Sequence, residues 1–270
     1  MLGLYGKKDI KADQKFFGFS MEIDKIYNED CLVGMKAIPD KSIDAIICDL
    51  PYGTTACKWD VVIPFDRLWE QYRRIVKDNG AIVLFGKQPF TSQLILSNLE
   101  MFRYELIWEK SRVGNNMQLG KRPASIHENI VVFYKQYPTF NEIKFQVDEK
   151  YIDKRKSIRN STYSKSEHYQ GEMIRKKDDG WRHSQSILPF NSVWQSGMHP
   201  TQKPVNLISW LIRTYTNEGD LVLDNCMGSG TTAIACIKEK RHFIGYEITK
   251  EYFDIAQERI KQEQSQLTLF

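Results

Sequence analysis

Short apolar runs alternate with amphipathic segments along most of the chain. Runs of strand length precede Asp49 and Asp224 and also occupy Ala81–Phe85 and Arg241–Glu247. Helices are expected near Phe65–Lys77, from Pro204 onward with Leu207, Ile208, Leu211, Ile212 and Tyr215 on one face, after Thr231, and at Lys250–Glu263. This alternation predicts an α/β fold in which helices cover both faces of a mostly parallel sheet. Strands near Tyr104–Trp108 and Asn129–Tyr134 are expected to form an antiparallel pair that finishes the sheet.

The first strand ends in the sequence Asp49-Leu50-Pro51-Tyr52, which suits methylation of an exocyclic amine of a nucleobase. Such a nitrogen is a weak nucleophile because its lone pair is delocalised into the ring. The Asp49 carboxylate can accept one N–H of the amine, and the Leu50 carbonyl, oriented by Pro51, can accept the other. Acceptors fixed in advance stabilise the positive charge that the nitrogen gains during the reaction.

Tyr52 meets a second requirement of that chemistry. A base in a duplex must be flipped out to reach such a pocket, at a cost of a few kcal/mol. Stacking on the Tyr52 ring returns about 1–3 kcal/mol, and a hydrogen bond to the charged Asp49 contributes roughly 1.5–3 kcal/mol. Without further context, the tetrapeptide is equally well explained as an ordinary turn after a strand.

A glycine-rich turn after the strand that ends at Asp224 provides that context. Gly228 and Gly230 allow backbone N–H groups to approach a ligand, and Asp224 can accept from a cationic amino group. Glu247 ends the next strand, where it can accept both hydroxyls of a ribose. The same spacing fits a dinucleotide fingerprint, so this element leaves adenosylmethionine and NAD open. No lysine precedes Thr231, which excludes a P-loop.

With both segments in view, the chain resembles the β-class DNA amino-methyltransferases, which modify adenine N6 or cytosine N4. The resemblance covers Met21 to about Gln264 and rests on the order of elements: Asp49–Tyr52, a variable region, His199–Pro204, then Asp224–Thr232. It implies an S-adenosyl-L-methionine-dependent methyltransferase fold, Rossmann-like, with an inserted target-recognition region. It also implies that Asp49, Pro51 and Tyr52 are catalytic, and that the cofactor contacts are Asp30, Cys31, Asp49, Thr201, Lys203, Asp224, Gly228, Gly230, Thr231 and Glu247.

Three positions depart from the family pattern. Leu50 replaces the usual proline of the catalytic tetrapeptide, and Asn225 and Cys226 stand where proline and phenylalanine are usual. An acid at the position of Asp49 is more typical of adenine-modifying members, whereas serine is typical of cytosine-modifying ones. Methylation of a cytosine ring carbon is disfavoured because no Pro-Cys nucleophile is present.

Composition agrees with a cytoplasmic enzyme. The 270 residues carry a net charge of +4 and are 41% hydrophobic, enough for one domain with an elaboration. No apolar run is long enough to cross a membrane, and the N-terminus lacks a signal-peptide pattern. The five cysteines show no Cys-x-x-Cys spacing, and no His, Asp and Glu residues have metal-ligand spacing, so neither disulfides nor a metal are expected.

Periodicity disappears between about Gln136 and Phe190, where cations and aromatic residues are mixed with acids. We interpret residues 136–190 as the target-recognition insertion between a catalytic half, 21–135, and a cofactor-binding half, 191–264; residues 1–20 are an N-terminal extension. A solvated loop is the plainer explanation, and only the catalytic context disfavours it. The candidate DNA contacts are Lys154, Arg155, Lys156, Arg159, Arg175, Lys176, Lys177 and Arg182.

The C-terminal tail, residues 265–270, suggests a protein partner. Gln266, Leu267, Leu269 and Phe270 resemble the peptide that bacterial replication proteins insert into the sliding clamp, although a tail folded onto its own domain explains the pattern equally well. The main expectation is N6-adenine methylation of duplex DNA, and the family resemblance makes a homodimer plausible. The alternatives are N4-cytosine methylation, a catalytically silent DNA-binding relative, a dinucleotide oxidoreductase, and methylation of RNA or of a protein glutamine.

Overall fold

The computed structural model describes residues 22–55, 57, 59–113, 120–152, 178–193 and 202–267. The chain divides into two compact units: Met1–Asn141 together with Ser186–Phe270, and Glu142–Gln185. None of the helices in the described ranges combines the length and apolarity that crossing a bilayer requires.

The larger unit is built on a sheet whose described strands run in the order β1-β10-β9-β2-β3-β5-β4-β8. The strands are β1 (Lys25–Tyr27), β2 (Ile43–Cys48), β3 (Val76–Gly86), β4 (Phe102–Lys110), β5 (His127–Phe133), β8 (Ile187–Phe190), β9 (Leu221–Asp224) and β10 (His242–Tyr246). Neighbours from β1 to β3 are parallel, and β5 is antiparallel to both β3 and β4. The predicted mostly parallel α/β fold is therefore confirmed.

One expectation about the sheet is wrong. The antiparallel pair β4 and β5 does not finish it, because β8 adds to β4 in parallel, with Ile187 opposite Ile107. The run that forms β8 contains Pro189, which discourages a strand assignment from sequence. An edge strand tolerates proline because one row of its backbone groups needs no partner. The smaller compact unit, Glu142–Gln185, ends before β8.

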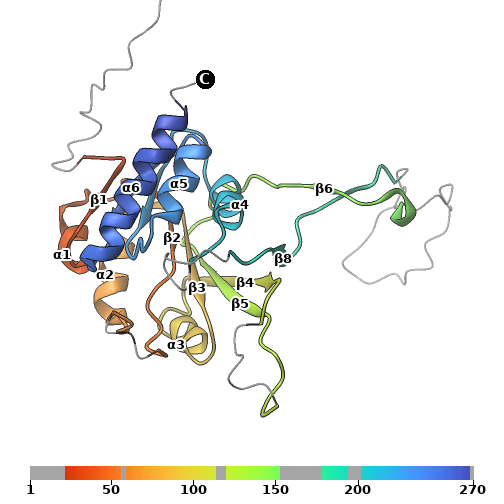
Figure 1. Cartoon of the computed structure of the whole chain (residues 1–270), viewed down its shortest axis with the longest axis horizontal. Helices are drawn as coiled ribbons and strands as arrows, with labels where there is room; N and C mark the ends of the chain where they lie inside the picture. The colour runs from red at the N-terminus through yellow and green to blue at the C-terminus, as the bar shows by residue number, and fades with distance from the viewer. Residues whose placement is uncertain are drawn as a thin grey trace, which may run out of the picture. The chain divides into compact units, whose positions relative to one another are not determined.

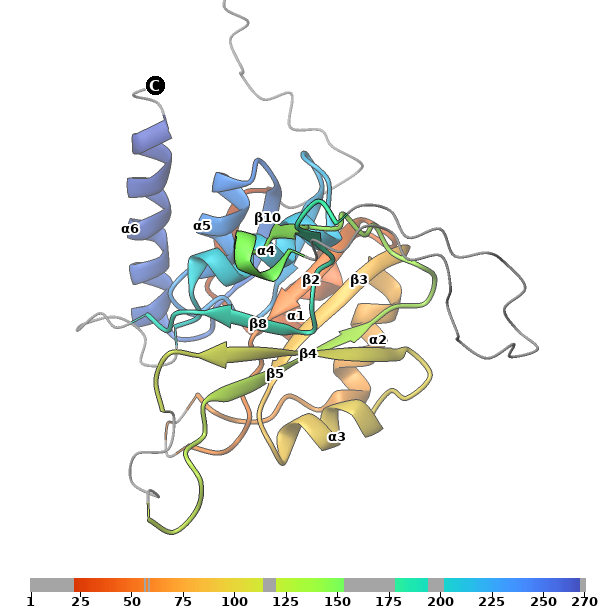
Figure 2. The ribbon, with the colours of Figure 1, turned by 90° about the vertical axis from the view of Figure 1, so that its right-hand side faces the viewer.

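Helices cover both faces of this sheet (Figures 1 and 2). They are α1 (Cys31–Gly34), followed by the 3₁₀ turn η1 (Met35–Ala37), then α2 (Phe65–Ile75), α3 (Phe90–Leu96), α4 (Val205–Tyr215), α5 (Thr231–Lys238) and α6 (Lys250–Leu267). The apolar residues of α4, α5 and α6 belong to one buried cluster, and those of α1, α2 and α3 to a second cluster. The sheet separates the two cores, which accounts for its strands being apolar on both sides.

The turn before α5 brings two helices unusually close together. Gly230 caps α5 in the left-handed region, with φ 84°. A β-carbon built on Gly230 would lie 3.0 Å from the Cβ of Ala256 in α6. The conformation and the contact both favour glycine at this position.

The topology determines where a ligand can bind. β2 and β9 are adjacent and parallel, but β2 leads to α2 on one face while β9 leads to α5 on the other. Such a switch point leaves a crevice at the carboxyl ends of the two strands. Asp49 follows β2 and Asp224 ends β9, so the sequence places both acids at this crevice.

The smaller unit contains the antiparallel strands β6 (Phe145–Gln146) and β7 (Trp181–Arg182) and the 3₁₀ turn η3 (Glu149–Tyr151). Arg182 donates to both carboxylate oxygens of Asp178, at 2.7 and 2.8 Å. Its guanidinium therefore takes part in the local structure of this unit.

Asn141 and Ser186 are the residues of the larger unit that flank the smaller unit in the sequence. Both are hydrogen-bonded to other residues of the larger unit. Asn141 donates from its backbone to the Thr214 carbonyl at 2.8 Å and from its amide to the Thr216 carbonyl at 2.9 Å. The Ser186 carbonyl accepts from Ile107 at 2.7 Å.

Candidate active site

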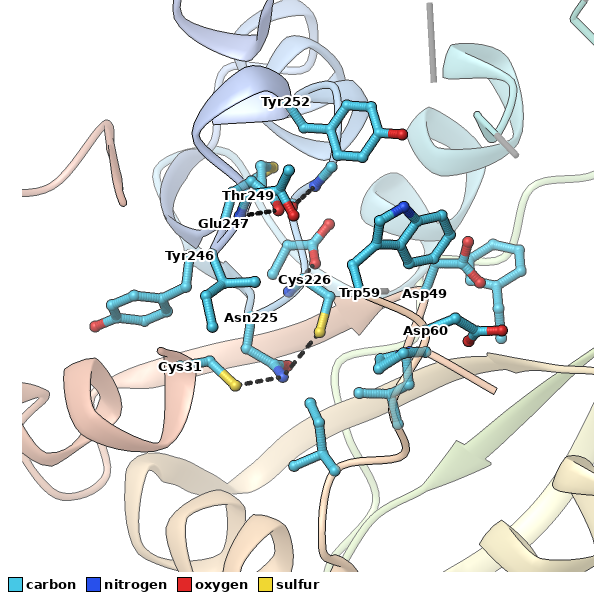
Figure 3. Close-up of a pocket in the computed structure, with 18 of the residues that line it drawn as sticks. Cys31, Asp49, Trp59, Asp60, Asn225, Cys226, Tyr246, Glu247, Thr249 and Tyr252 are labelled. Atoms are coloured by element: carbon cyan, nitrogen blue, oxygen red, sulfur yellow. Dashed lines mark hydrogen bonds between the residues drawn. The ribbon is translucent and has the colours of Figure 1, made fainter. Parts of the chain in front are cut away.

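A cavity of about 620 Å³ lies at the carboxyl ends of β2, β9 and β10 (Figure 3). Its wall includes Asp49, Leu50, Pro51 and Tyr52 from the segment after β2. It also includes the glycine turn after β9 and Glu247 after β10. The cavity therefore joins the two segments that the sequence singled out, and its volume suits a small-molecule ligand.

The Asp49 carboxylate is held from two sides. The Tyr52 hydroxyl donates to Asp49 Oδ1 at 2.6 Å, and the Lys203 ammonium donates to Oδ2. Burial, reinforced by the charges of Asp49 and Glu128, raises the pKa of Tyr52 well above its usual value, so the phenol remains a donor. The Tyr52 ring stacks on Phe90, with ring centroids 5.0 Å apart. One face of the ring expected to receive a base is thus packed against α3.

Charged side chains of alternating sign follow one another from Lys203 through Glu128 to Lys110. The Lys203 ammonium lies 3.4 Å from Glu128 Oε2, and Glu128 Oε1 accepts from Lys110. Glu128 is only 9% exposed and Lys203 only 7%. Burial opposes the ionised form of Glu128, but Lys203 and Lys110 outweigh it and lower its pKa; likewise, Asp49 and Glu128 raise the pKa of Lys203 against the effect of burial. Sequence reasoning missed Glu128, since nothing in the apolar run of β5 signals a polar partner across the sheet.

The loop after Tyr52 is organised by Asp60, which sequence reasoning also missed. Its carboxylate accepts from the backbone N–H groups of Gly53, Thr54 and Thr55 at 2.7–2.9 Å. Although burial acts in the opposite direction, these hydrogen bonds lower the pKa of Asp60. Trp59, the residue before Asp60, packs edge to face against Tyr252 of α6 at the wall of the cavity (Figure 3). The two ring centroids are 6.2 Å apart.

The glycine turn is fixed by the two acids that flank it. Glu247 accepts from the backbone of Gly228 and Thr249, both at 2.8 Å, and Asp224 accepts from the Thr232 hydroxyl at 2.6 Å. Burial raises the pKa of Asp224 to about 6 and also raises that of Glu247. Both carboxylates are therefore poised to gain from a cationic or hydroxyl-bearing ligand. Thr231 lies beside them as the first residue of α5.

Asn225, one of the departures from the family pattern, ties three elements together at the far end of the cavity (Figure 3). Its amide donates to the sulfur atoms of Cys31 and Cys226, both at 3.6 Å, and its oxygen accepts from Tyr72 of α2. The Cys226 thiol and burial raise the pKa of Cys31, so that thiol stays protonated. Asp30 lines the cavity and also caps α1 by accepting from Leu32 at 2.7 Å.

The lining of the cavity is strongly acidic. Its described residues include one lysine, Lys203, and seven acids: Glu29, Asp30, Asp49, Asp60, Glu128, Asp224 and Glu247. Two buried acceptors in the wall, Gln202 Oε1 and Glu128 Oε2, have no hydrogen-bond partner among the described residues. This lining favours a cationic ligand with several donors, and it disfavours the pyrophosphate of a dinucleotide.

Several expected site residues cannot be placed. Thr201 and the candidate DNA contacts Lys154, Arg155, Lys156, Arg159, Arg175, Lys176 and Lys177 lie outside the described residues. The same holds for Leu269 and Phe270 of the tail, whereas Gln266 and Leu267 form the end of α6. Among the described His, Cys, Asp and Glu residues, no group has the arrangement of a metal site.

The chain is similar to known proteins over most of its length. The N6/N4 methyltransferase family model, described as DNA methylase, matches residues 43–258. The type II methyltransferase M2.MboI of Moraxella bovis is 30% identical over 263 residues, which cover 87% of this chain and 86% of that protein. The type II methyltransferase M.BglII of Bacillus subtilis is 28% identical over 261 residues, covering 87% and 68% of the two chains.

Solved structures share the fold. The crystal structure of the M1.HpyAVI–SAM complex has a TM-score of 0.56 and 26% identity, covering 87% of this chain and 98% of that one. The cytosine-N4-specific PvuII DNA methyltransferase has a TM-score of 0.59 and 16% identity, covering 88% and 90%. At that identity, the second likeness concerns the fold alone.

Proposed function

The chain belongs to the DNA methylase family of N6 and N4 methyltransferases, and we propose that it methylates the N6 amine of a flipped adenine in duplex DNA. The observation that carries this proposal is the single cavity shared by Asp49 and the glycine turn. The choice of adenine is supported by the acid at position 49, which is typical of adenine-modifying members. Methylation of cytosine N4 is the second candidate, because the matching family model includes N4 as well as N6 methyltransferases.

The residues of the cavity suit S-adenosyl-L-methionine, the cofactor of this family and the molecule complexed with the similar M1.HpyAVI. Glu247 would accept the ribose hydroxyls and Asp224 the ammonium group, while Asp30 and Cys31 line the wall beside them. The unpartnered oxygen of Gln202 provides a further buried acceptor in that wall. When bound, the cofactor supplies an electrophilic methyl group.

In the proposed mechanism the protein's own groups activate the target amine. Asp49 accepts one N–H of the target amine and the Leu50 carbonyl accepts the other, which draws the nitrogen lone pair out of the ring. Tyr52 and Lys203 hold the Asp49 carboxylate in place. Because these acceptors are fixed before the reaction, they stabilise the charge that develops on the nitrogen without further reorganisation. Asp49 is then the nearest base for the proton that the methylated amine releases.

A direct test is to incubate the protein with unmethylated duplex DNA and labelled adenosylmethionine, digest the DNA and identify the labelled nucleoside by mass spectrometry. We expect N6-methyl-2′-deoxyadenosine. N4-methyl-2′-deoxycytidine would retain the mechanism and overturn the choice of base. Cofactor binding without label in the DNA would favour a different substrate or the catalytically silent alternative instead.

Glu247 provides a test of the cofactor site. Glu247→Ala is expected to raise the Kd for adenosylmethionine about 10–100-fold, since it removes a charged acceptor for two hydroxyls and frees the Gly228 N–H that it now receives. Glu251→Ala, an exposed acid in the first turn of α6, is the matched control and should bind normally. Calorimetric titration measures both. Unchanged affinity in Glu247→Ala would remove Glu247 from the cofactor site.

The affinity for adenosylmethionine should also depend on pH through Asp224. Its folded pKa of about 6 lies above the ordinary value of an aspartate, so ionisation costs the ligand-free protein stability as the pH rises through this range. Binding of a cationic ligand offsets the free-energy cost of ionising Asp224. The Kd should therefore fall about tenfold between pH 5 and pH 7. Asp224→Asn should flatten the profile, and an equally steep profile in that variant would place the titrating group elsewhere.

The partners follow from the same proposal. Duplex DNA is the expected substrate, with target recognition proposed for the insertion unit and its cations, and a type II restriction-modification role is supported by relatives of that class. A homodimer and binding of the tail to a sliding clamp remain proposals. Comparing clamp pull-down with and without residues 267–270 tests the second: equal recovery would discard it.

A further inference from the structure

Glu128 is a buried acid of the active-site cavity to which the mechanism above gives no role. It lies near the start of β5, opposite Trp108 of β4, and its exposed fraction is only 9%. Its side chain lines the same cavity as Asp49. An ionised group so deeply buried is costly unless it is paired, so its partners indicate its role.

The two carboxylate oxygens of Glu128 have different surroundings. Oε1 accepts from Lys110, whereas Oε2 has no hydrogen-bond partner among the described residues and lies 3.4 Å from Lys203 Nζ. The Lys203 ammonium, 5.1 Å from the centre of the Phe85 ring, donates to Asp49. Lys203 thus lies between two acids, one of which faces the reacting amine in the proposed reaction.

Lys203 has opposite effects on that reaction. Its ammonium orients the Asp49 carboxylate by donating to Oδ2, which favours attack by the amine. Its positive charge also opposes the positive charge that the amine nitrogen acquires, because both cations approach the same carboxylate. A second carboxylate on the far side of Lys203 offsets the second effect and preserves the first.

We propose that Glu128 is a positioning residue that acts through Lys203: it holds the ammonium against Asp49 and compensates its charge while the target amine becomes cationic. This inference rests on the proposed amine methylation. Lys110 in turn neutralises Glu128, so the four charges Asp49, Lys203, Glu128 and Lys110 sum to zero before the amine reacts. The competing explanation is that Glu128 only joins β4 to β5 through Lys110.

Kinetics separate the two explanations. Glu128→Gln is expected to lower the single-turnover rate of methyl transfer about 10–100-fold, while the Kd values for adenosylmethionine and DNA change less than threefold. Glu128→Asp, which keeps the charge, should recover most of the rate. Glu105→Gln, an exposed acid on β4, is the matched control and should react like the parent protein. A rate within twofold of the parent in Glu128→Gln, or equal losses in both Glu128 variants, would overturn the proposal.

A second measurement does not depend on catalysis. The ammonium of a buried, ion-paired lysine exchanges its protons slowly, so ¹⁵N-labelled protein should show a Lys203 Nζ signal, assigned by its loss in Lys203→Met. The signal is expected in the parent and in Glu128→Asp and should broaden or vanish in Glu128→Gln. An unchanged signal in Glu128→Gln contradicts the positioning role. Failure of the parent protein to methylate any DNA would instead refute the proposed function, and the ammonium signal would still report on the link between Glu128 and Lys203.

Discussion

Replacing Asp49 with alanine is expected to reduce the rate of methyl transfer by about 10²–10³-fold while leaving the affinity for adenosylmethionine nearly unchanged. In the proposed mechanism the carboxylate is the charged acceptor for the target amine, so its loss removes an interaction that strengthens as the nitrogen becomes cationic. Single-turnover assays at saturating cofactor and DNA measure this loss directly.

The alanine variant also leaves Lys203 without one of its two acidic neighbours. Asp49→Asn is the better-matched variant for that reason, since it keeps the shape and one acceptor oxygen but loses the charge. Asp40→Ala, an exposed acid paired with Arg74, serves as the control. Retained turnover in both Asp49 variants would overthrow the catalytic assignment, and a large loss of cofactor affinity would assign Asp49 to the cofactor site instead.

Lys203→Met is expected to lower the free energy of unfolding by about 3–5 kcal/mol, the usual effect of removing one partner of a buried ion pair. The ammonium contacts both Asp49 and Glu128, and without it these two carboxylates lose the positive charge that they share. Denaturant titration of the parent and the variant measures the difference. Lys135→Met, at an exposed ion pair with Asp78, is the control and should cost less than about 1 kcal/mol.

The pH dependence distinguishes a charge effect from a loss of packing. In Lys203→Met, Glu128 loses one of the two charges that lower its pKa and faces the negative charge of Asp49, so the pKa of Glu128 should rise. Its protonation at pH 5 should then remove part of the penalty that is present at pH 8. The stability difference between parent and variant should therefore shrink as the pH falls. A difference that stays constant from pH 5 to pH 8 would mean that lost packing, and not the charge, is responsible.

The sequence alone was enough to find the features that local residues determine. Apolar runs followed by an acid marked β2, β9 and β10, and Gly228 and Gly230 marked the turn because no other residue type adopts such a conformation so readily. The family resemblance added the order of the two halves, from which the shared crevice follows.

Features that depend on contacts distant in the chain were not predictable. Lys203 and Asp49 are separated by 154 positions, and the sequence suggested only that Lys203 touches the cofactor. Glu128 lies in a mostly apolar strand whose pattern does not indicate its ion-pair partners. Asp60 is an acid in a loop, and only the structure shows that it accepts from three backbone N–H groups. In each case the role of the side chain arises from the fold that surrounds it.

The anchoring of Asn141 and Ser186 within the larger unit has a consequence for evolution and engineering. Both residues are hydrogen-bonded to helix, loop and strand groups of the larger unit. The segment between them is therefore expected to be exchangeable without a change to the core. Under the target-recognition role proposed for this segment, a chimera that carries the corresponding segment of a relative is expected to keep its chemistry and acquire a different recognition sequence. On the same proposal, recombination of this one segment would let such enzymes diversify the DNA sites that they methylate.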